Sequence, residues 1–148
     1  MISYFPDLNV WVALAVEQHV HHLQAANWLG SLEGSSRAIF SRYTQIGLLR
    51  LLTNAAVMGT AVLTLGRAWA DYERFLEDPR IDFFPEPGGI DAAFLEATVP
   101  HFGKPASKAV GDCYLLAFAK QSDAALVTFD KGLLELARKH RCRALVPA

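Results

Sequence analysis

The sequence predicts a three-layer α/β/α fold with a central parallel sheet, built from residues 1–148 as one domain. Short apolar segments with strand character alternate with longer segments of helical periodicity along the chain, as in folds with parallel strands and crossover helices. Hydrophobic residues make up 52% of the 148 positions and charged residues 20%, a composition that supports a buried core and argues against disorder. No repeat, low-complexity tract or linker divides the chain.

Turn and capping residues set the expected boundaries. Ser41 and Thr64 are suitable helix N-caps, because a hydroxyl can accept a hydrogen bond from a free backbone N–H. Pro85 ends the third strand, because proline has no backbone N–H to donate. We expect strands at 1–6, 37–40, 81–84, 124–129 and 142–146. We expect helices at 9–16, 20–32, 42–54, 65–76, 91–99, 109–120 and 131–140, with a break at 59–60.

The charge balance and the cysteines narrow the class of protein. The formal net charge is -1, so any nucleic-acid site must be a local cluster of basic residues or a bound cation. Cys113 and Cys142 fall in a predicted helix and a predicted strand without a CxxC pattern, which favours core packing in a reduced, cytoplasmic protein. We expect no signal peptide, and no apolar run reaches the roughly 18 residues of a membrane helix.

Three aspartates are the candidates for catalysis. Asp7 and Asp130 follow the first and fourth predicted strands, where sites of parallel sheets lie, although each could simply cap the next helix. Asp112 begins an apolar helical run and shares a face with Leu115 and Leu116. A carboxylate there costs several kcal/mol unless it is paired or binds a metal. The alternative is a first-turn aspartate stabilised by the helix dipole.

Together, Asp7, Asp112 and Asp130 predict a divalent metal site. Carboxylates that converge repel one another, and a bound Mg²⁺, or Mn²⁺ as a substitute, removes that repulsion. Such an ion activates water and stabilises the charge that develops in phosphodiester cleavage.

The motifs around these acids resemble the PIN-domain family. DLNVWVAL, GDCYLLAFA and LVTFDKG carry the family resemblance, and FSRYTQIGLLRLLTNAAVMG resembles VapC-type toxins in particular. The resemblance covers essentially the whole chain. It implies Mg²⁺-dependent endoribonuclease activity, homodimers and neutralisation by a small VapB-type antitoxin. By position, Asp7, Asp112 and Asp130 match the family's metal-site acids, and Thr128 matches a small hydroxyl residue beside them.

Gln45 departs from the family pattern, which has a glutamate at this position. It shares a helical face with Leu48, Leu49 and Leu52, so it should point toward the core. An amide oxygen can hold a metal-bound water but brings no charge, so we place Gln45 with Thr128 around the metal rather than among its acids. A catalytically weakened module that only binds RNA or a partner therefore stays open. If Gln45 serves the metal, Gln45→Glu should tighten Mg²⁺ binding.

Basic residues near the same sheet edge are candidates for phosphate contacts. Arg42 follows the second strand, and Lys108 precedes Asp112. Charge-assisted hydrogen bonds from such residues fix a nucleic-acid backbone without reading its sequence. The alternative is ordinary solvated charge.

Two other groups of residues have simpler interpretations. Glu86 follows the third strand, which should be at the sheet edge, so it replaces the missing acid only if that edge curls inward; otherwise it is a turn residue. The segment HVHH, with His19, His21 and His22, suggests a metal tract, but we interpret it as surface polar residues at a helix entry.

The expected partners are RNA and an antitoxin. An antitoxin arginine could pair with the three acids, while an amphipathic helix covers apolar surface near Trp28 and the stripe from Leu48 to Leu52. Aspartyl phosphotransfer proteins are the competing class. The second and third strands end at Phe40-Ser41 and Phe84-Pro85 without the acceptor aspartate of a receiver domain, and Asp7-Leu8-Asn9 is not the DxD of a haloacid-dehalogenase phosphatase.

Overall fold

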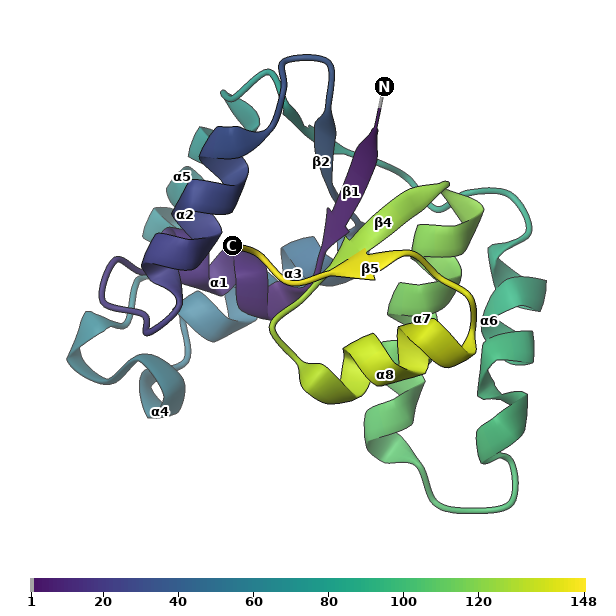
Figure 1. Cartoon of the computed structure of the whole chain (residues 1–148). Coiled ribbons are helices and arrows are strands. Elements are labelled where there is room, and N and C mark those ends of the chain that lie inside the picture. The colour runs from purple at the N-terminus through teal and green to yellow at the C-terminus, as the bar shows by residue number, and fades with distance from the viewer. Residues whose placement is uncertain (1) are drawn as a thin grey trace.

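The central layer is a five-stranded, all-parallel sheet, as the alternating sequence pattern predicted. The computed structural model describes residues 2–148, and its strands are arranged in the order β3-β2-β1-β4-β5 (Figure 1). The strands are β1 (Ser3–Pro6), β2 (Arg37–Phe40), β3 (Ile81–Phe83), β4 (Ala124–Val127) and β5 (Ala144–Leu145). β1 pairs with both β2 and β4, so the ends of these strands lie next to one another.

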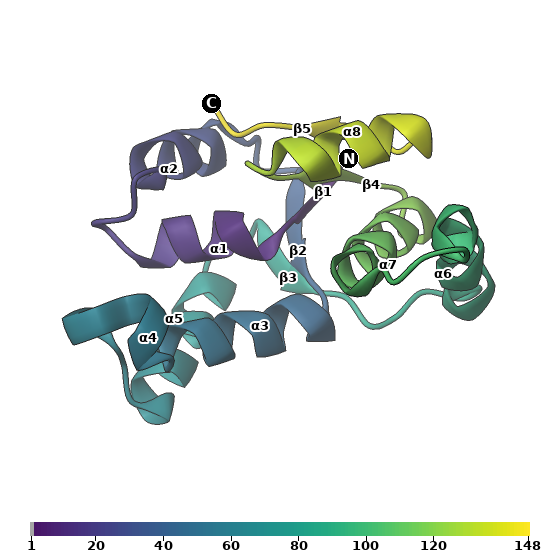
Figure 2. The same ribbon diagram turned by 90° about the horizontal axis from the view of Figure 1, so that it is seen from below.

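Helices cover both faces of the sheet (Figure 2). They are α1 (Leu8–Ala15), α2 (His22–Ser31), α3 (Arg42–Leu52), α4 (Ala55–Met58), α5 (Leu65–Leu76), α6 (Ile90–Thr98), α7 (Ser107–Gln121) and α8 (Lys131–Lys139), with 3-10 turns η1 (Gly59–Ala61) and η2 (Val99–His101). The predicted caps are confirmed: the Ser41 hydroxyl accepts from the Thr44 amide at 3.1 Å, and the Thr64 hydroxyl accepts from the Arg67 amide at 3.2 Å.

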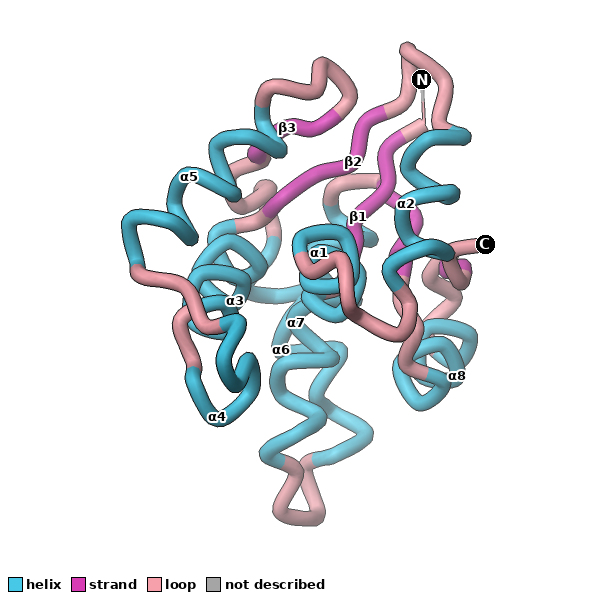
Figure 3. Tube along the Cα trace, turned by 90° about the vertical axis from the view of Figure 1, so that its left-hand side faces the viewer, coloured by secondary structure: helices cyan, strands magenta, loops and turns pink. Residues whose placement is uncertain are grey.

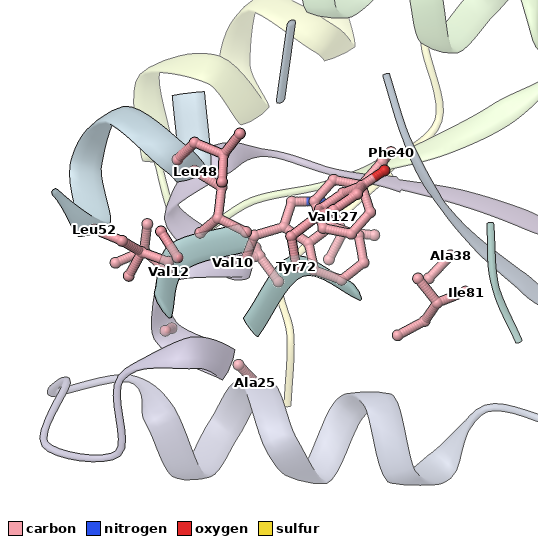
Figure 4. Close-up of a cluster of buried hydrophobic side chains, with 14 of the residues drawn as sticks. Val10, Val12, Ala25, Ala38, Phe40, Leu48, Leu52, Tyr72, Ile81 and Val127 are labelled. Carbon is pink, nitrogen blue, oxygen red and sulfur yellow. The ribbon is translucent and has the colours of Figure 1, made fainter. Parts of the chain in front are cut away.

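Alternating side chains of the strands divide the core into two clusters. Ala38 and Phe40 of β2 pack with α1, α2, α3 and α5, whereas Ile39 packs with α6, α7 and α8 on the other face. In the first cluster the ring of Trp11 stacks on Phe40 with centroids 3.8 Å apart, and Tyr72 meets Phe40 edge-on at 4.9 Å (Figure 4). Burial on both faces explains why the strands read as short apolar runs without polar alternation.

Several boundaries differ from the sequence prediction; for example, β4 ends at Val127 rather than at residue 129, and α2 spans His22–Ser31 rather than 20–32. The last strand begins at Ala144 rather than at residue 142, because the Cys142 amide donates to the Ala137 carbonyl at 2.9 Å and so closes the end of α8. Arg141 has a φ of 55°, the left-handed conformation typical of such a helix end. The chain also continues as α4 and η1 where we expected only a break.

Both cysteines are buried and free, as predicted. Burial raises the pKa of the Cys113 thiol, and it raises the pKa of the Cys142 thiol as well. Within residues 2–148, no helix has the length and apolar character needed to cross a membrane.

The carboxyl ends of the strands lead directly into helices. β1 continues into α1 and β2 into α3 (Figure 3), and α8 follows β4 after three residues, 128–130. The hairpin of α6 and α7 extends beyond the same edge of the sheet, so the first turns of α7 lie near the ends of β1 and β4 (Figures 1 and 3). The three candidate acids, Asp7, Asp112 and Asp130, lie in the segments at this edge.

Candidate metal centre at the carboxyl edge of the sheet

Asp7 links the end of β1 to the start of α1. One carboxylate oxygen caps the helix by accepting from the Leu8 amide at 2.6 Å, and the other accepts from the Thr128 hydroxyl at 2.9 Å. The Asp7 amide donates to the Val127 carbonyl at 2.8 Å, which continues the pairing of β1 with β4. The residue is therefore both a helix cap and a fixed carboxylate.

Thr128 connects the ends of the two central strands. Its side chain is completely buried, and its Oγ1 accepts from the Asp130 amide at 3.0 Å while it donates to Asp7. The same oxygen lies 3.3 Å from Asn9 Nδ2, and Asn9 Oδ1 accepts from the Phe129 amide at 3.3 Å. Sequence reasoning missed the role of Asn9, although a polar residue two positions after a strand-ending aspartate was visible in DLN.

Asp130 caps α8 and keeps one oxygen free of the cap. Its Oδ1 accepts from the Gly132 amide at 2.8 Å and from the Leu133 amide at 3.2 Å. Its Oδ2 faces Lys108, whose Nζ is 3.8 Å away. Lys108 is thus placed beside the acids, as the sequence predicted.

Asp112 lies in the second turn of α7 because the helix begins at Ser107, two residues before the predicted start. The alternative of a first-turn aspartate held by the helix dipole is therefore wrong, since that effect is confined to the first turn. The Asp112 side chain is half-buried, and within residues 2–148 no hydrogen bond reaches its carboxylate. This leaves Asp112 without the stabilising partners that Asp7 and Asp130 have.

The three carboxylates interact through their charges. Burial raises the pKa of Asp112, the negative charges of Asp130 and Asp7 raise it further, and Lys108 opposes the shift. Burial also raises the pKa of Asp7, against the hydrogen bonds from Thr128 and Leu8, and the charge of Asp130 adds to the increase. Each acid thus lies in the field of the others, as expected for a site that takes up a cation.

The side chains are not drawn together to the distances of a closed metal site. Among the residues that the structure describes, 2–148, no three Asp, Glu, His or Cys side chains are grouped closely enough to hold an ion. Carboxylate oxygens are nevertheless the ligands that Mg²⁺ prefers, and Asp112 and one oxygen of Asp130 are free to turn toward a cation. The assignment of Asp7, Asp112 and Asp130 as metal ligands stays a prediction.

Gln45 and Arg42 contact each other rather than the three acids. Gln45 is buried, and its Oε1 accepts from Arg42 Nη1 at 2.5 Å. The Arg42 guanidinium lies 4.5 Å above the centre of the Phe83 ring. Burial raises the pKa of the nearby Tyr72 phenol, which the positive charge of Arg42 and a hydrogen bond with Gln45 oppose. Arg42 is therefore directed toward β3, and its predicted phosphate contact is untested.

Glu86 is hydrogen-bonded to Tyr114 rather than to any of the three acids. It follows β3, which is at the edge of the sheet as predicted, and it accepts a hydrogen bond from the Tyr114 hydroxyl at 2.5 Å. This contact ties Glu86 to α7 across a pocket that also contains Arg42.

The histidines lie at the entry to α2, as the sequence predicted. His22 begins the helix, and its Nδ1 lies 2.7 Å from the Ala13 carbonyl oxygen. The His21 ring stacks on Phe129 with centroids 4.4 Å apart. The segment is thus closer to the end of β4 than its distance in sequence suggested, although its histidines do not contact the three acids.

A groove leads away from the acids over α1. Its wider part, about 870 Å³, begins at Asp7 and Asn9, and a neighbouring pocket of about 470 Å³ shares Leu8 with it. Apolar side chains of α1, α3 and α4 line the wider part: Leu8, Val12, Val16, Leu51, Val57 and Met58.

The apolar surface expected near Trp28 and the leucine stripe is not available. Trp28 is only 5% exposed, and Leu48, Leu49 and Leu52 also lie in the core. Trp28 packs edge-on against Tyr4 of β1, with ring centroids 5.7 Å apart, and the three leucines lie in the same core cluster, so the apolar periodicity of α2 and α3 marks faces that are turned to the core.

Known proteins place the chain in a family. The PIN domain model matches residues 4–139. A protein named ribonuclease VapC41 from Mycobacterium tuberculosis is 42% identical over 133 residues, which cover 87% of this chain and 90% of that relative. The toxin–antitoxin complex VapBC2 from Rickettsia felis, solved with promoter DNA, has a TM-score of 0.70 at 14% identity and covers 98% of both chains. VapC20 from M. tuberculosis, described as a toxin that cleaves the sarcin-ricin loop, has a TM-score of 0.65 at 17% identity. The match covers 89% of this chain and 93% of VapC20. The match over most of the sequence, together with the shared fold, shows that this chain belongs to the PIN domain family.

Proposed function

We propose that this chain is a divalent-metal-dependent endoribonuclease that acts as the toxin of a toxin–antitoxin pair. The observation that carries the proposal is the placement of Asp7, Asp112 and Asp130, which come from three elements at the carboxyl edge of the sheet; burial, and then the charges of the neighbouring acids, raise the pKa values of Asp7 and Asp112. The relative named ribonuclease VapC41, with 42% identity over most of both chains, supports RNA as the substrate.

The residues around the acids suit Mg²⁺, with Mn²⁺ as a substitute. The carboxylates of Asp7, Asp112 and Asp130 would hold the ion, and Thr128 fixes the orientation of Asp7 through its hydroxyl. When bound, such an ion supplies Lewis-acid activation of water and stabilises the charge on the scissile phosphate. Gln45 is buried in contact with Arg42, so it would influence the site through the packing of α3 rather than as a charged ligand.

The protein's own contribution to RNA binding is local. Lys108 is 80% exposed and lies beside Asp130, so its ammonium group can contact a phosphate oxygen next to the acids. This arrangement reconciles a net charge of -1 with a polyanionic substrate, because the attraction comes from one lysine and the cation rather than from the whole surface.

The antitoxin would bind in the groove that starts at Asp7. An arginine of the antitoxin can form paired hydrogen bonds with carboxylates and so replace the cation. The apolar side chains further along the groove, including Leu8, Leu51 and Met58, suit the apolar face of a peptide helix. This binding would cover the acids without unfolding the toxin. The predicted homodimer and its interface stay predictions.

The test is cleavage of labelled RNA by the purified full chain. We expect cleavage with Mg²⁺ or Mn²⁺, no cleavage in EDTA, and inhibition by the product of a short neighbouring gene that encodes the antitoxin. Cleavage that persists in EDTA would refute the metal mechanism. An antitoxin peptide whose affinity ignores both Mg²⁺ and Asp112→Asn would refute binding at the acids.

A further inference from the structure

Apart from the groove over α1, another pocket lies beside the candidate metal centre, on the side of β3. It has a volume of about 590 Å³, which is the size of a small-ligand site. Its walls come from the start of α3, the end of β3 and the second turn of α7. Five of its side chains carry the argument: Arg42, Tyr43, Phe83, Glu86 and Tyr114.

The walls of this pocket are rich in flat aromatic surface. The rings of Tyr43 and Tyr114 lie with centroids 5.2 Å apart, and the Arg42 guanidinium covers Phe83 at 4.5 Å. Tyr43 is 47% exposed, so a ligand can reach its ring. Aromatic rings and arginine planes are the surfaces on which proteins stack unpaired RNA bases.

The polar groups of the pocket have opposite hydrogen-bonding character. The Glu86 carboxylate accepts from Tyr114 through Oε2, and each of its oxygens can accept further hydrogen bonds. Arg42 uses Nη1 for Gln45 and keeps other N–H donors, because a guanidinium has five. Guanine presents adjacent N1–H and N2–H donors on one edge and the O6 and N7 acceptors on the other, so it complements both groups.

The pocket adjoins the acids through a close contact between α3 and α7. A Cβ built on Gly111 would lie only 2.6 Å from the Tyr43 hydroxyl, so the two helices touch one residue before Asp112. A nucleotide with its base on Tyr43 would therefore bring its sugar and phosphate toward Asp112 and Lys108.

We propose that this pocket binds a guanine base of the RNA next to the scissile phosphate, with Glu86 and Arg42 reading its edges and the exposed ring of Tyr43 stacking on it. The inference deepens the proposed nuclease function and rests on it. It also explains why Arg42 is directed toward Phe83 rather than toward the acids. Glu86, which we interpreted from the sequence as a turn residue, is then the group that selects the base.

The first test measures binding without metal, by NMR titration of the full chain with each of the four 5′-nucleoside monophosphates. GMP should bind about tenfold more tightly than AMP, CMP or UMP, because one well-placed pair of base hydrogen bonds discriminates by about that factor. Glu86→Gln should remove the preference, whereas Glu33→Gln, an exposed glutamate in the loop before β2, should keep it. Equal binding of all four nucleotides would reveal a site for phosphate alone and would overturn the proposal.

The second test uses cleavage of oligoribonucleotides that differ in a single unpaired base. The wild-type chain should cut best beside guanine, and Glu86→Gln should still cut but with the preference reduced about tenfold. Cleavage with the same base preference in wild type and Glu86→Gln would overturn the pocket assignment and leave the nuclease proposal intact. Preferential GMP binding that depends on Glu86, in a chain that cuts no RNA, would support the pocket and refute the nuclease proposal.

Discussion

The ends of β1 and β4 differ from the end of β2 in the charge of the side chains that follow them. At β1 and β4, Asp7 and Asp130 are fixed as helix caps, and burial together with the charges of neighbouring acids raises the pKa values of Asp7 and Asp112. At β2, the neutral Gln45 is buried, and its Oε1 accepts a hydrogen bond from Arg42. The β1 and β4 side of the sheet edge thus carries crowded negative charge. On the β2 side, a neutral amide is hydrogen-bonded within the protein.

This difference shows which part of the edge depends on a ligand. Crowded carboxylates are stabilised when a cation binds, whereas a neutral amide whose oxygen already accepts from Arg42 gains little from it. A glutamate in the place of Gln45 would add charge on the side where Arg42 already lies. The loss of one acid is therefore compatible with a cation site on the β1 and β4 side.

The largest effect is expected from Asp112→Asn, which removes the carboxylate that has no hydrogen-bond partner within residues 2–148. RNA cleavage should fall by about 100- to 1,000-fold, the loss typical when a group that stabilises the transition state is removed. Asp7→Asn and Asp130→Asn should also abolish cleavage. The matched control is Asp91→Asn, in the exposed first turn of α6, which should cleave at the wild-type rate. Cleavage by Asp112→Asn at the wild-type rate would contradict the assignment of the cation site to the β1 and β4 side of the sheet edge.

Thr128→Val should have the next largest effect, because its hydroxyl joins Asp7 to the Asp130 amide. We expect Mg²⁺ affinity to fall by about 10-fold or more, as for other residues that orient metal ligands. The unfolding free energy should fall by about 1–3 kcal/mol, because the partly buried Asp130 amide loses its partner. Thr128→Ser, which keeps the hydroxyl, is the control. Mg²⁺ affinity that is equal in Thr128→Val and Thr128→Ser would show that this hydroxyl does not orient Asp7 for the metal.

Gln45→Glu tests the β2 side of the sheet edge. The new carboxylate should pair with Arg42, so Mg²⁺ affinity should change by less than about threefold, or about 0.7 kcal/mol. Replacing Arg42 at the same time, as Arg42→Gln with Gln45→Glu, frees that charge and should tighten Mg²⁺ binding. Strong tightening in the single variant would show instead that Gln45 serves the metal directly.

The smallest effect concerns stability without metal. The pKa of Asp112 is raised in the folded protein, so the folded state holds more protons than the unfolded one, and this residue makes stability fall as pH rises from about 4. Asp112→Asn should remove that loss and raise the melting temperature near pH 7 by about 2 °C, with no gain near pH 3. Melting curves at both pH values in EDTA measure it. A destabilised variant at pH 7 would mean that Asp112 has a stabilising partner.

The sequence predicted the fold well because the fold depends on local rules, and the same rules place the candidate acids, whose role as metal ligands stays a prediction. Alternating apolar segments define the parallel sheet, and a polar residue after a buried strand marks its carboxyl edge, as with Asp7 and Asp130. The contacts that depend on tertiary packing could not be read from the chain. Arg42 over Phe83 and Tyr114 with Glu86 join residues whose separations in sequence, about 30 to 40 positions, carry no pattern.

The most direct test is a calorimetric titration of Mn²⁺ into the full-length wild type, Asp112→Asn and Asp91→Asn. The crowded carboxylates predict one ion bound per chain in the wild type and in Asp91→Asn, with affinity at least about tenfold lower in Asp112→Asn. Equal Mn²⁺ affinity in all three proteins would contradict the claim that Asp7, Asp112 and Asp130 form the metal centre.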